Sequence, residues 1–131
     1  MIKILLTLCF FIISIHADHV HWLANYDKAL QKAQKEHKPL MVLLVKKECP
    51  SCNDVIKNSF MGQKYVTLLN QKFVSVIVTY EGRESYPIEM FYSTIFPTLF
   101  FVSSQTEVFL SEPLYGESID EKSIEKFLKE F

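Results

Sequence analysis

The chain has 131 residues, which is the size of one domain and leaves no room for a second hydrophobic core. Hydrophobic residues make up 49% and charged residues 22%, a composition that excludes a disordered or fibrous chain. The formal net charge is −1, so the charge balance gives no indication of a nucleic-acid partner held by phosphate contacts.

The first seventeen residues have the pattern of a secretory signal peptide. Lys3 precedes an apolar run that ends at Ile15, and Ala17 offers a small residue for cleavage. The run is shorter than the roughly 20 residues that cross a bilayer, and an uncleaved membrane anchor is the alternative interpretation. We therefore expect a signal peptide at 1–17, a mature domain at 18–131, and secretion across an inner membrane into a periplasm.

The first half of the mature chain alternates between helical and strand patterns. Apolar and small residues recur at helical spacing from Trp22 to Lys38, and Pro39 ends this helix. Leu40–Val45 is an unbroken apolar run, which is typical of a central strand covered on both faces. The predicted elements are a helix at 22–38, a strand at 40–45, a helix at 52–60, a short helix at 65–69 and a strand at 73–79.

The second half predicts a hairpin and a closing helix. Its elements are a short helix at 88–92, a strand at 98–102, an antiparallel partner at 107–110 and a helix at 119–131. Ser118 and Glu121 have the spacing of a capping box at the start of the last helix. Alternation requires a parallel strand pair with a crossover, and the hairpin adds antiparallel pairing. We predict an α/β fold with a mixed central sheet of four or five strands flanked by helices.

Two cysteines lie where the buried strand gives way to a helix. Cys49 and Cys52 are three residues apart, so the first helical turn brings their sulfur atoms within bonding distance. A helix N-terminus stabilises a thiolate, so the pKa of Cys49 should lie below the usual value of about 8.5. We expect Cys49 to be the exposed attacking thiol and Cys52 the buried thiol that resolves a mixed disulfide.

Two other interpretations of this pair stay open. A structural disulfide is one, although closing a four-residue ring contributes little stability. A metal site is the other, but it would need about four ligands. The histidines His19, His21 and His37 complete no zinc motif, so we expect neither a metal nor another cofactor.

A second motif joins the cysteine pair. Ile95-Phe96-Pro97-Thr98 precedes the predicted hairpin strand, and together the two motifs resemble the thioredoxin superfamily. The resemblance covers about residues 22–131 and implies a thioredoxin fold. It also implies that Pro97 is cis, beside the two sulfur atoms, and that Phe96 and Pro97 line the substrate groove.

The resemblance further implies a thiol–disulfide oxidoreductase that acts on protein thiols and disulfides. Glu48, Pro50 and Ser51 would then form the active-site loop around the cysteine pair. We expect a monomer, an unidentified redox partner such as a membrane thiol reductant transporter, and no nucleic acid. The same pair can act as a reductant or, run backwards, as an oxidant.

The chain departs from the family pattern at Leu43, six residues before Cys49, where many members bury an acid. Without that acid, proton transfer from Cys52 must use water, Glu48 or a substrate group. This departure favours a narrower set of partners than that of a general thioredoxin. It also motivates a second hypothesis, a protein-binding module with an inert cysteine pair, and a metal chaperone is a third.

Overall fold

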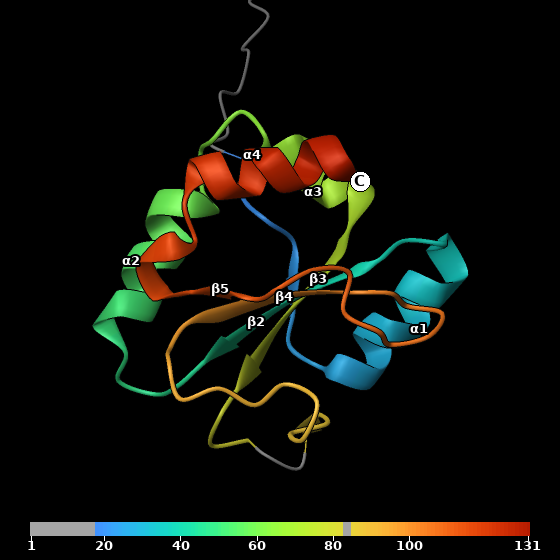
Figure 1. The fold of residues 1–131 in the computed structure, drawn as a ribbon, viewed down its shortest axis with the longest axis horizontal. Helices are drawn as coiled ribbons and strands as arrows, with labels where there is room; N and C mark the ends of the chain where they lie inside the picture. Colours follow the sequence, from blue (N-terminus) through green and yellow to red (C-terminus); the bar gives the residue numbers. More distant parts are fainter. Residues whose placement is uncertain (1–17, 83–84) are drawn as a thin grey trace, which may run out of the picture.

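The computed structural model describes residues 18–82 and 85–131, and the predicted signal peptide at 1–17 lies outside them. Five strands form one mixed sheet in the order β1-β3-β2-β4-β5, as predicted for the thioredoxin fold (Figure 1). The elements are β1 (Trp22–Leu23), α1 (Tyr26–Glu36), β2 (Leu40–Val45), α2 (Pro50–Ser59), α3 (Val66–Lys72), β3 (Val74–Thr79), β4 (Thr98–Val102), β5 (Leu114–Tyr115), the 3₁₀ turn η2 (Gly116–Ser118) and α4 (Glu121–Glu130).

Strand β2 lies at the centre of the sheet. It pairs in parallel with β3 and antiparallel with β4, so that Leu43 is opposite Ile77 on one side and Leu99 on the other. This arrangement confirms the predicted parallel strand pair and the mixed sheet. The unbroken apolar run of β2 follows from its position, because both faces of a central strand are covered by helices.

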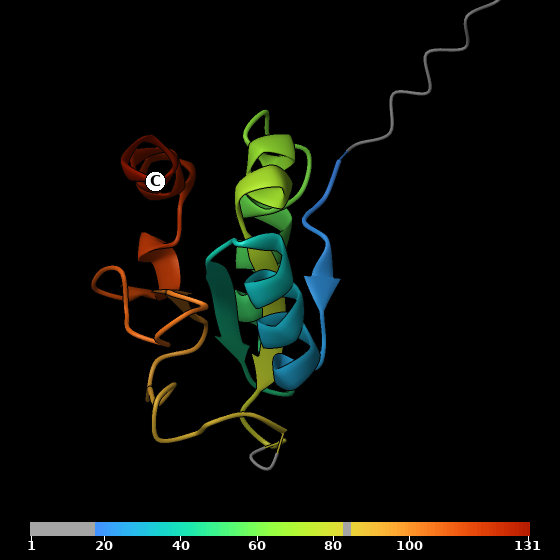
Figure 2. The ribbon, with the colours of Figure 1, turned by 90° about the vertical axis from the view of Figure 1, so that its right-hand side faces the viewer.

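The sheet separates two hydrophobic cores. Side chains alternate along a strand, so Met41 and Leu43 face the core shared with α2, α3 and α4. Val42 and Leu44 face the other core, which includes the buried side of α1. Figure 1 shows α1 apart from the other three helices, and Figure 2 shows α4 end-on, to one side of the central strands. The loop between β2 and α2 begins at the carboxyl end of the central strand.

The start of the chain differs from the prediction. Trp22 and Leu23 form a strand rather than the first turn of a helix, because they pair in parallel with Ser75 and Val76 of β3. Helix α1 begins four residues later, where the Asn25 side chain accepts a hydrogen bond from the Lys28 N–H at 2.9 Å. The predicted helix at 22–38 was thus too long at its N-terminus.

Three details of the second half also differ. Residues 88–92 form turns instead of a helix, with the N–H groups of Met90 and Phe91 both donating to the carbonyl of Pro87. The strand that pairs with β4 on the side away from β2 is β5. The segment 107–110 does lie antiparallel to the end of β4, but through an isolated bridge between Phe109 and Val102 and not as a strand. Helix α4 is capped by Asp120 and not by Ser118, which lies within η2.

Candidate active site

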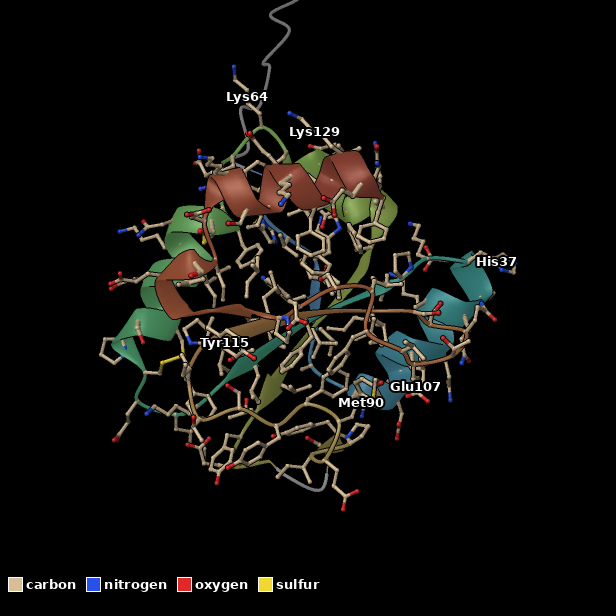
Figure 3. All side chains as sticks on the ribbon, viewed as in Figure 1. His37, Lys64, Met90, Glu107, Tyr115 and Lys129 are labelled. Carbon is tan, nitrogen blue, oxygen red and sulfur yellow. A yellow bond between two sulfur atoms is a disulfide. The ribbon has the colours of Figure 1, made fainter. Side chains whose placement is uncertain are left out.

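The cysteine pair forms a disulfide directly after β2. The Cys49 and Cys52 sulfur atoms are bonded at 2.08 Å, with their Cα atoms 5.2 Å apart, at the start of α2 (Figure 3). The predicted approach of the two sulfur atoms around the first helical turn is therefore confirmed. This disulfide is the oxidised form of the cysteine pair, and reduction would convert it to two thiols.

Cys49 is the N-cap residue of α2. Its Sγ accepts a hydrogen bond from the Cys52 N–H at 3.1 Å, and its carbonyl accepts one from the Asn53 N–H at 3.2 Å. Pro50 occupies the first helical position, where its missing N–H costs no hydrogen bond. The first turn carries no acidic residue, so no carboxylate in that turn opposes a negative charge on the Cys49 sulfur.

Glu48 completes the turn between strand and helix. Its φ of 51° lies in the left-handed region, which a non-glycine residue adopts at some cost. Glu48 is followed directly by Cys49, the residue that caps α2. The side chain of Glu48 is exposed, so its carboxylate is solvated.

The exposure of Cys49 differs from the prediction. Cys49 is only 5% exposed and Cys52 is 2% exposed, so neither residue is open to solvent in the disulfide form. The expectation of an exposed Cys49 is therefore wrong for this state. The bond to Cys52 covers one side of the Cys49 sulfur, and the Ser51 hydroxyl lies 3.4 Å from it.

The loop before β4 meets the disulfide site. The Phe96–Pro97 peptide bond is cis, as the resemblance implied, and Pro97 is buried. The Ser51 hydroxyl donates a hydrogen bond to the Phe96 carbonyl at 3.2 Å, which ties the first turn of α2 to this loop. The two sequence motifs are thereby brought together although they are 45 residues apart.

The Phe96 ring is held by residues from two other loops. It meets the Tyr80 ring edge-on, with 5.5 Å between ring centroids. The Lys46 ammonium lies 5.3 Å from the Phe96 centroid, within the range of a cation–π contact. Lys46 follows β2 and Tyr80 follows β3, so the parallel pairing of these strands places both residues at the same edge of the sheet.

Tyr80 contacts the site through Phe96, but the sequence alone did not predict this residue as part of the site. The signal that could have identified it is its place directly after a strand that pairs in parallel with the strand before the cysteines. The carboxyl ends of parallel strands meet at one edge of a sheet, where ligand sites gather in open α/β folds. An aromatic residue at that point was therefore a candidate from its position alone.

Among the residues that the structure describes, no aspartate or glutamate is buried, so none takes the place of the absent acid. Leu43 is fully buried and packs in the same core as Val55 of α2.

Within 18–82 and 85–131, no group of three or more histidine, cysteine or acidic residues is arranged to hold a metal ion. Over the same ranges, no helix is both long and apolar enough to span a membrane.

The structure has the thioredoxin fold. A thioredoxin from Thermus thermophilus superposes with a TM-score of 0.67 at 24% identity, covering 86% of this chain and 87% of that one. A structure described as a DsbH oxidoreductase superposes with a TM-score of 0.68 at 17% identity, covering 89% of this chain and 87% of that one. At these identities the likeness establishes the fold.

The chain belongs to the Thioredox_DsbH family, described as "Protein of unknown function, DUF255", whose model matches residues 7–111. Anterior gradient protein 2-B of Xenopus laevis is 30% identical over 64 residues, 49% of this chain and 38% of that protein. Spermatogenesis-associated protein 20 of Rattus norvegicus is 36% identical over 69 residues, 52% of this chain and 9% of that protein. This chain thus spans well under half the length of either relative.

The family, the fold and the disulfide point in the same direction. The disulfide lies at a helix N-terminus, which favours the thiolate needed for exchange. A cis proline and an aromatic residue lie at the same end of the sheet. Together these findings support a thiol–disulfide redox role for the chain.

Proposed function

We propose that this protein is a secreted thiol–disulfide oxidoreductase that exchanges disulfides with protein substrates through Cys49-Pro50-Ser51-Cys52. The observation that carries the proposal is the Cys49–Cys52 disulfide at the N-terminus of α2, tied by Ser51 to the cis Phe96–Pro97 loop. Phe96 and Pro97 would line the groove that receives the substrate chain.

In the reducing direction, the Cys49 thiolate attacks one sulfur of a substrate disulfide. A mixed disulfide forms, and the other substrate sulfur leaves as a thiolate that takes a proton from water. The Cys52 thiolate then attacks the Cys49 sulfur, which closes the protein disulfide and releases the second substrate thiolate. Two electrons have passed from the protein dithiol to the substrate, and the reverse sequence oxidises a substrate dithiol.

In the described part of the chain, no buried carboxylate is available to accept the proton of Cys52. Leu43 is fully buried where such an acid would lie, so the proton must pass to water, to the exposed Glu48 or to the departing substrate sulfur. This requirement would make turnover depend on how a substrate fills the site. It supports a narrow set of protein partners.

We also propose a periplasmic location and a monomeric state. The location rests on the signal-peptide pattern of residues 1–17. An external dithiol would have to restore the reduced form after each reducing cycle, and a membrane thiol reductant transporter is the partner class that suits a periplasmic protein. Fractionation of cells that express the full chain tests the location.

Two single substitutions test the exchange mechanism. Cys49→Ser should abolish disulfide exchange, because it removes the attacking sulfur. Cys52→Ser should leave a stable mixed disulfide between Cys49 and the substrate, because it removes the resolving sulfur. Turnover of a protein disulfide measures the first effect, and non-reducing electrophoresis detects the trapped complex. Wild-type turnover in both variants would refute the mechanism.

A protein-binding module with an inert cysteine pair is the second candidate. The burial of both cysteines and the leucine at position 43 favour it. The pKa of Cys49 after reduction discriminates between the two candidates. A value at or above about 8.5 would favour the binding module, and a lower value would favour the oxidoreductase. The metal content of the purified protein tests the metal-chaperone alternative.

A further inference from the structure

Ser51 lies between two acceptors of the candidate site. Its hydroxyl oxygen is 3.2 Å from the carbonyl oxygen of Phe96 and 3.4 Å from the Cys49 sulfur. A serine hydroxyl carries one hydrogen, so it can donate fully to only one of these acceptors at a time. A disulfide sulfur carries no hydrogen, so the Ser51 hydroxyl is the donor in each of these two contacts.

The redox state of Cys49 changes which acceptor is stronger. In the disulfide, the Cys49 sulfur is uncharged and accepts hydrogen bonds weakly, so the amide carbonyl of Phe96 is the better partner. After reduction, the helix N-terminus favours the thiolate form of the Cys49 sulfur. A hydrogen bond to a charged acceptor is about twice as strong as one between neutral groups, so the thiolate becomes the better partner.

We propose that Ser51 is a positioning residue whose hydroxyl donates to the Phe96 carbonyl when the disulfide is closed and to the Cys49 sulfur when it is open. This inference rests on the proposed function, because it requires that Cys49 and Cys52 interconvert between disulfide and dithiol. Rotation of one side-chain bond suffices for the exchange, since both acceptors already lie within 3.4 Å of the hydroxyl.

The exchange has two consequences for the reaction. The Cys52 N–H already donates to the Cys49 sulfur at 3.1 Å. In the reduced protein, the Ser51 hydroxyl becomes a second donor to the same sulfur. Two donors stabilise the attacking thiolate better than one. The same movement frees the Phe96 carbonyl, which then has an open acceptor site for an N–H of a bound polypeptide.

The thiolate half of the proposal is tested with Ser51→Ala and the matched control Ser51→Thr in the reduced protein. Removing the hydroxyl should raise the pKa of Cys49 by about one pH unit, the loss of one charge-assisted hydrogen bond, while threonine should retain the wild-type value. The pH dependence of Cys49 alkylation, with Cys52 replaced by serine in every variant, measures this pKa. An unchanged pKa in Ser51→Ala would overturn the proposal.

The charged groups close to Cys49 in the chain do not confound this comparison. Lys46, Lys47 and Glu48 precede it, and Asp54 follows on the exposed side of α2. All of them are retained in both Ser51 variants. A difference in the pH profile between Ser51→Ala and Ser51→Thr would therefore report on the hydroxyl.

The carbonyl half is tested by carbon-13 NMR of the Phe96 carbonyl in the protein with both cysteines present. The chemical shift should differ between wild type and Ser51→Ala in the oxidised protein and should coincide in the reduced protein. A difference that persists after reduction would overturn the proposed exchange. Disulfide turnover in the wild type is measured separately, so an inactive protein would refute the proposed function, whatever the Ser51 comparison gives.

Discussion

At the residue scale, Phe96 has more contacts in the candidate site than its place in the sequence indicates. Its carbonyl accepts the Ser51 hydrogen bond, its ring meets Tyr80, and the Lys46 ammonium lies over the ring. Three segments of the chain therefore fix the orientation of one half-buried side chain. A rigid aromatic residue beside a reactive disulfide is well suited to contact a substrate polypeptide.

Replacing Phe96 tests its proposed place in the substrate groove. Phe96→Ala should lower kcat/KM for a protein disulfide by about tenfold, because an aromatic anchor at an interface contributes more than about 1 kcal/mol. Val108→Ala is the control, since Val108 is 60% exposed on the loop after the far end of β4. Equal kcat/KM values in the two variants would contradict a substrate contact by Phe96.

The residue scale is also where prediction from sequence was most uneven. The approach of the two cysteines was predicted from their spacing, and the cis proline from the resemblance to a known family. The burial of Cys49 and the contact of Tyr80 with Phe96 were not. Both depend on loops that are distant in the chain and meet only after the sheet has formed.

At the element scale, two residues before helix α4 could act as its N-cap, and only one of them does. Ser118 and Glu121 have the capping-box spacing, but the Asp120 carboxylate accepts the hydrogen bond from the Ser123 N–H at 2.9 Å. This hydrogen bond is the main cause that lowers the pKa of Asp120 below its usual value of 3.8. Ser118 cannot cap the helix, because the chain forms the 3₁₀ turn η2 there and α4 starts three residues later.

Substitutions at these two positions distinguish the two caps. Asp120→Ala should lower the free energy of unfolding by about 1 kcal/mol at pH 7, which is the usual effect of losing an N-cap side chain. Ser118→Ala should change it by less than about 0.5 kcal/mol, as is usual for exposed positions. Urea denaturation measures both values. A larger loss in Ser118→Ala than in Asp120→Ala would restore the capping-box prediction.

The lowered pKa of Asp120 also predicts a pH dependence. Because the carboxylate is favoured in the folded state, its contribution is fully present above the unfolded pKa and is lost as the pH falls through the lower folded pKa. Asp120→Asn keeps a capping oxygen but cannot titrate. The difference in unfolding free energy between wild type and Asp120→Asn should therefore shrink or reverse as the pH falls below about 4.

At the scale of the whole molecule, the sheet joins two cores, and α4 covers one of them. The Phe127 ring stacks on Phe101 of β4 with 4.1 Å between centroids, and Phe101 in turn contacts Phe73. Phe127 therefore connects the last helix to β4 of the sheet. The terminal Phe131 also stacks on Phe127, but at 5.8 Å and with 45% of its side chain exposed.

This difference in burial predicts unequal effects of two similar substitutions. Phe127→Ala should lower the free energy of unfolding by about 3 kcal/mol or more, because it removes a buried ring and leaves a cavity. Phe131→Ala should cost less than about 1 kcal/mol, because its ring is half exposed already. Chemical denaturation followed by circular dichroism compares them. Equal losses would mean that α4 is not held to the sheet through Phe127.

The sequence by itself determined the order of the main helices and strands, the fold class and the cysteine pair at a helix start. These features follow from local patterns: an apolar run for a central strand, helical spacing for an amphipathic helix, and a short motif for the site. Each pattern lies within one stretch of chain, and the structure confirms the main elements it predicted.

Only the tertiary structure decided which residues close the edges of the sheet and surround the disulfide. Strands β1 and β5 have two residues each, too few for a periodic pattern, and they exist because a neighbouring strand offers them hydrogen bonds. The approach of Ser51 to Phe96, and of Phe96 to Tyr80, likewise requires strands that are distant in the chain to pair. Such contacts are set by the register of the sheet, which no single segment contains.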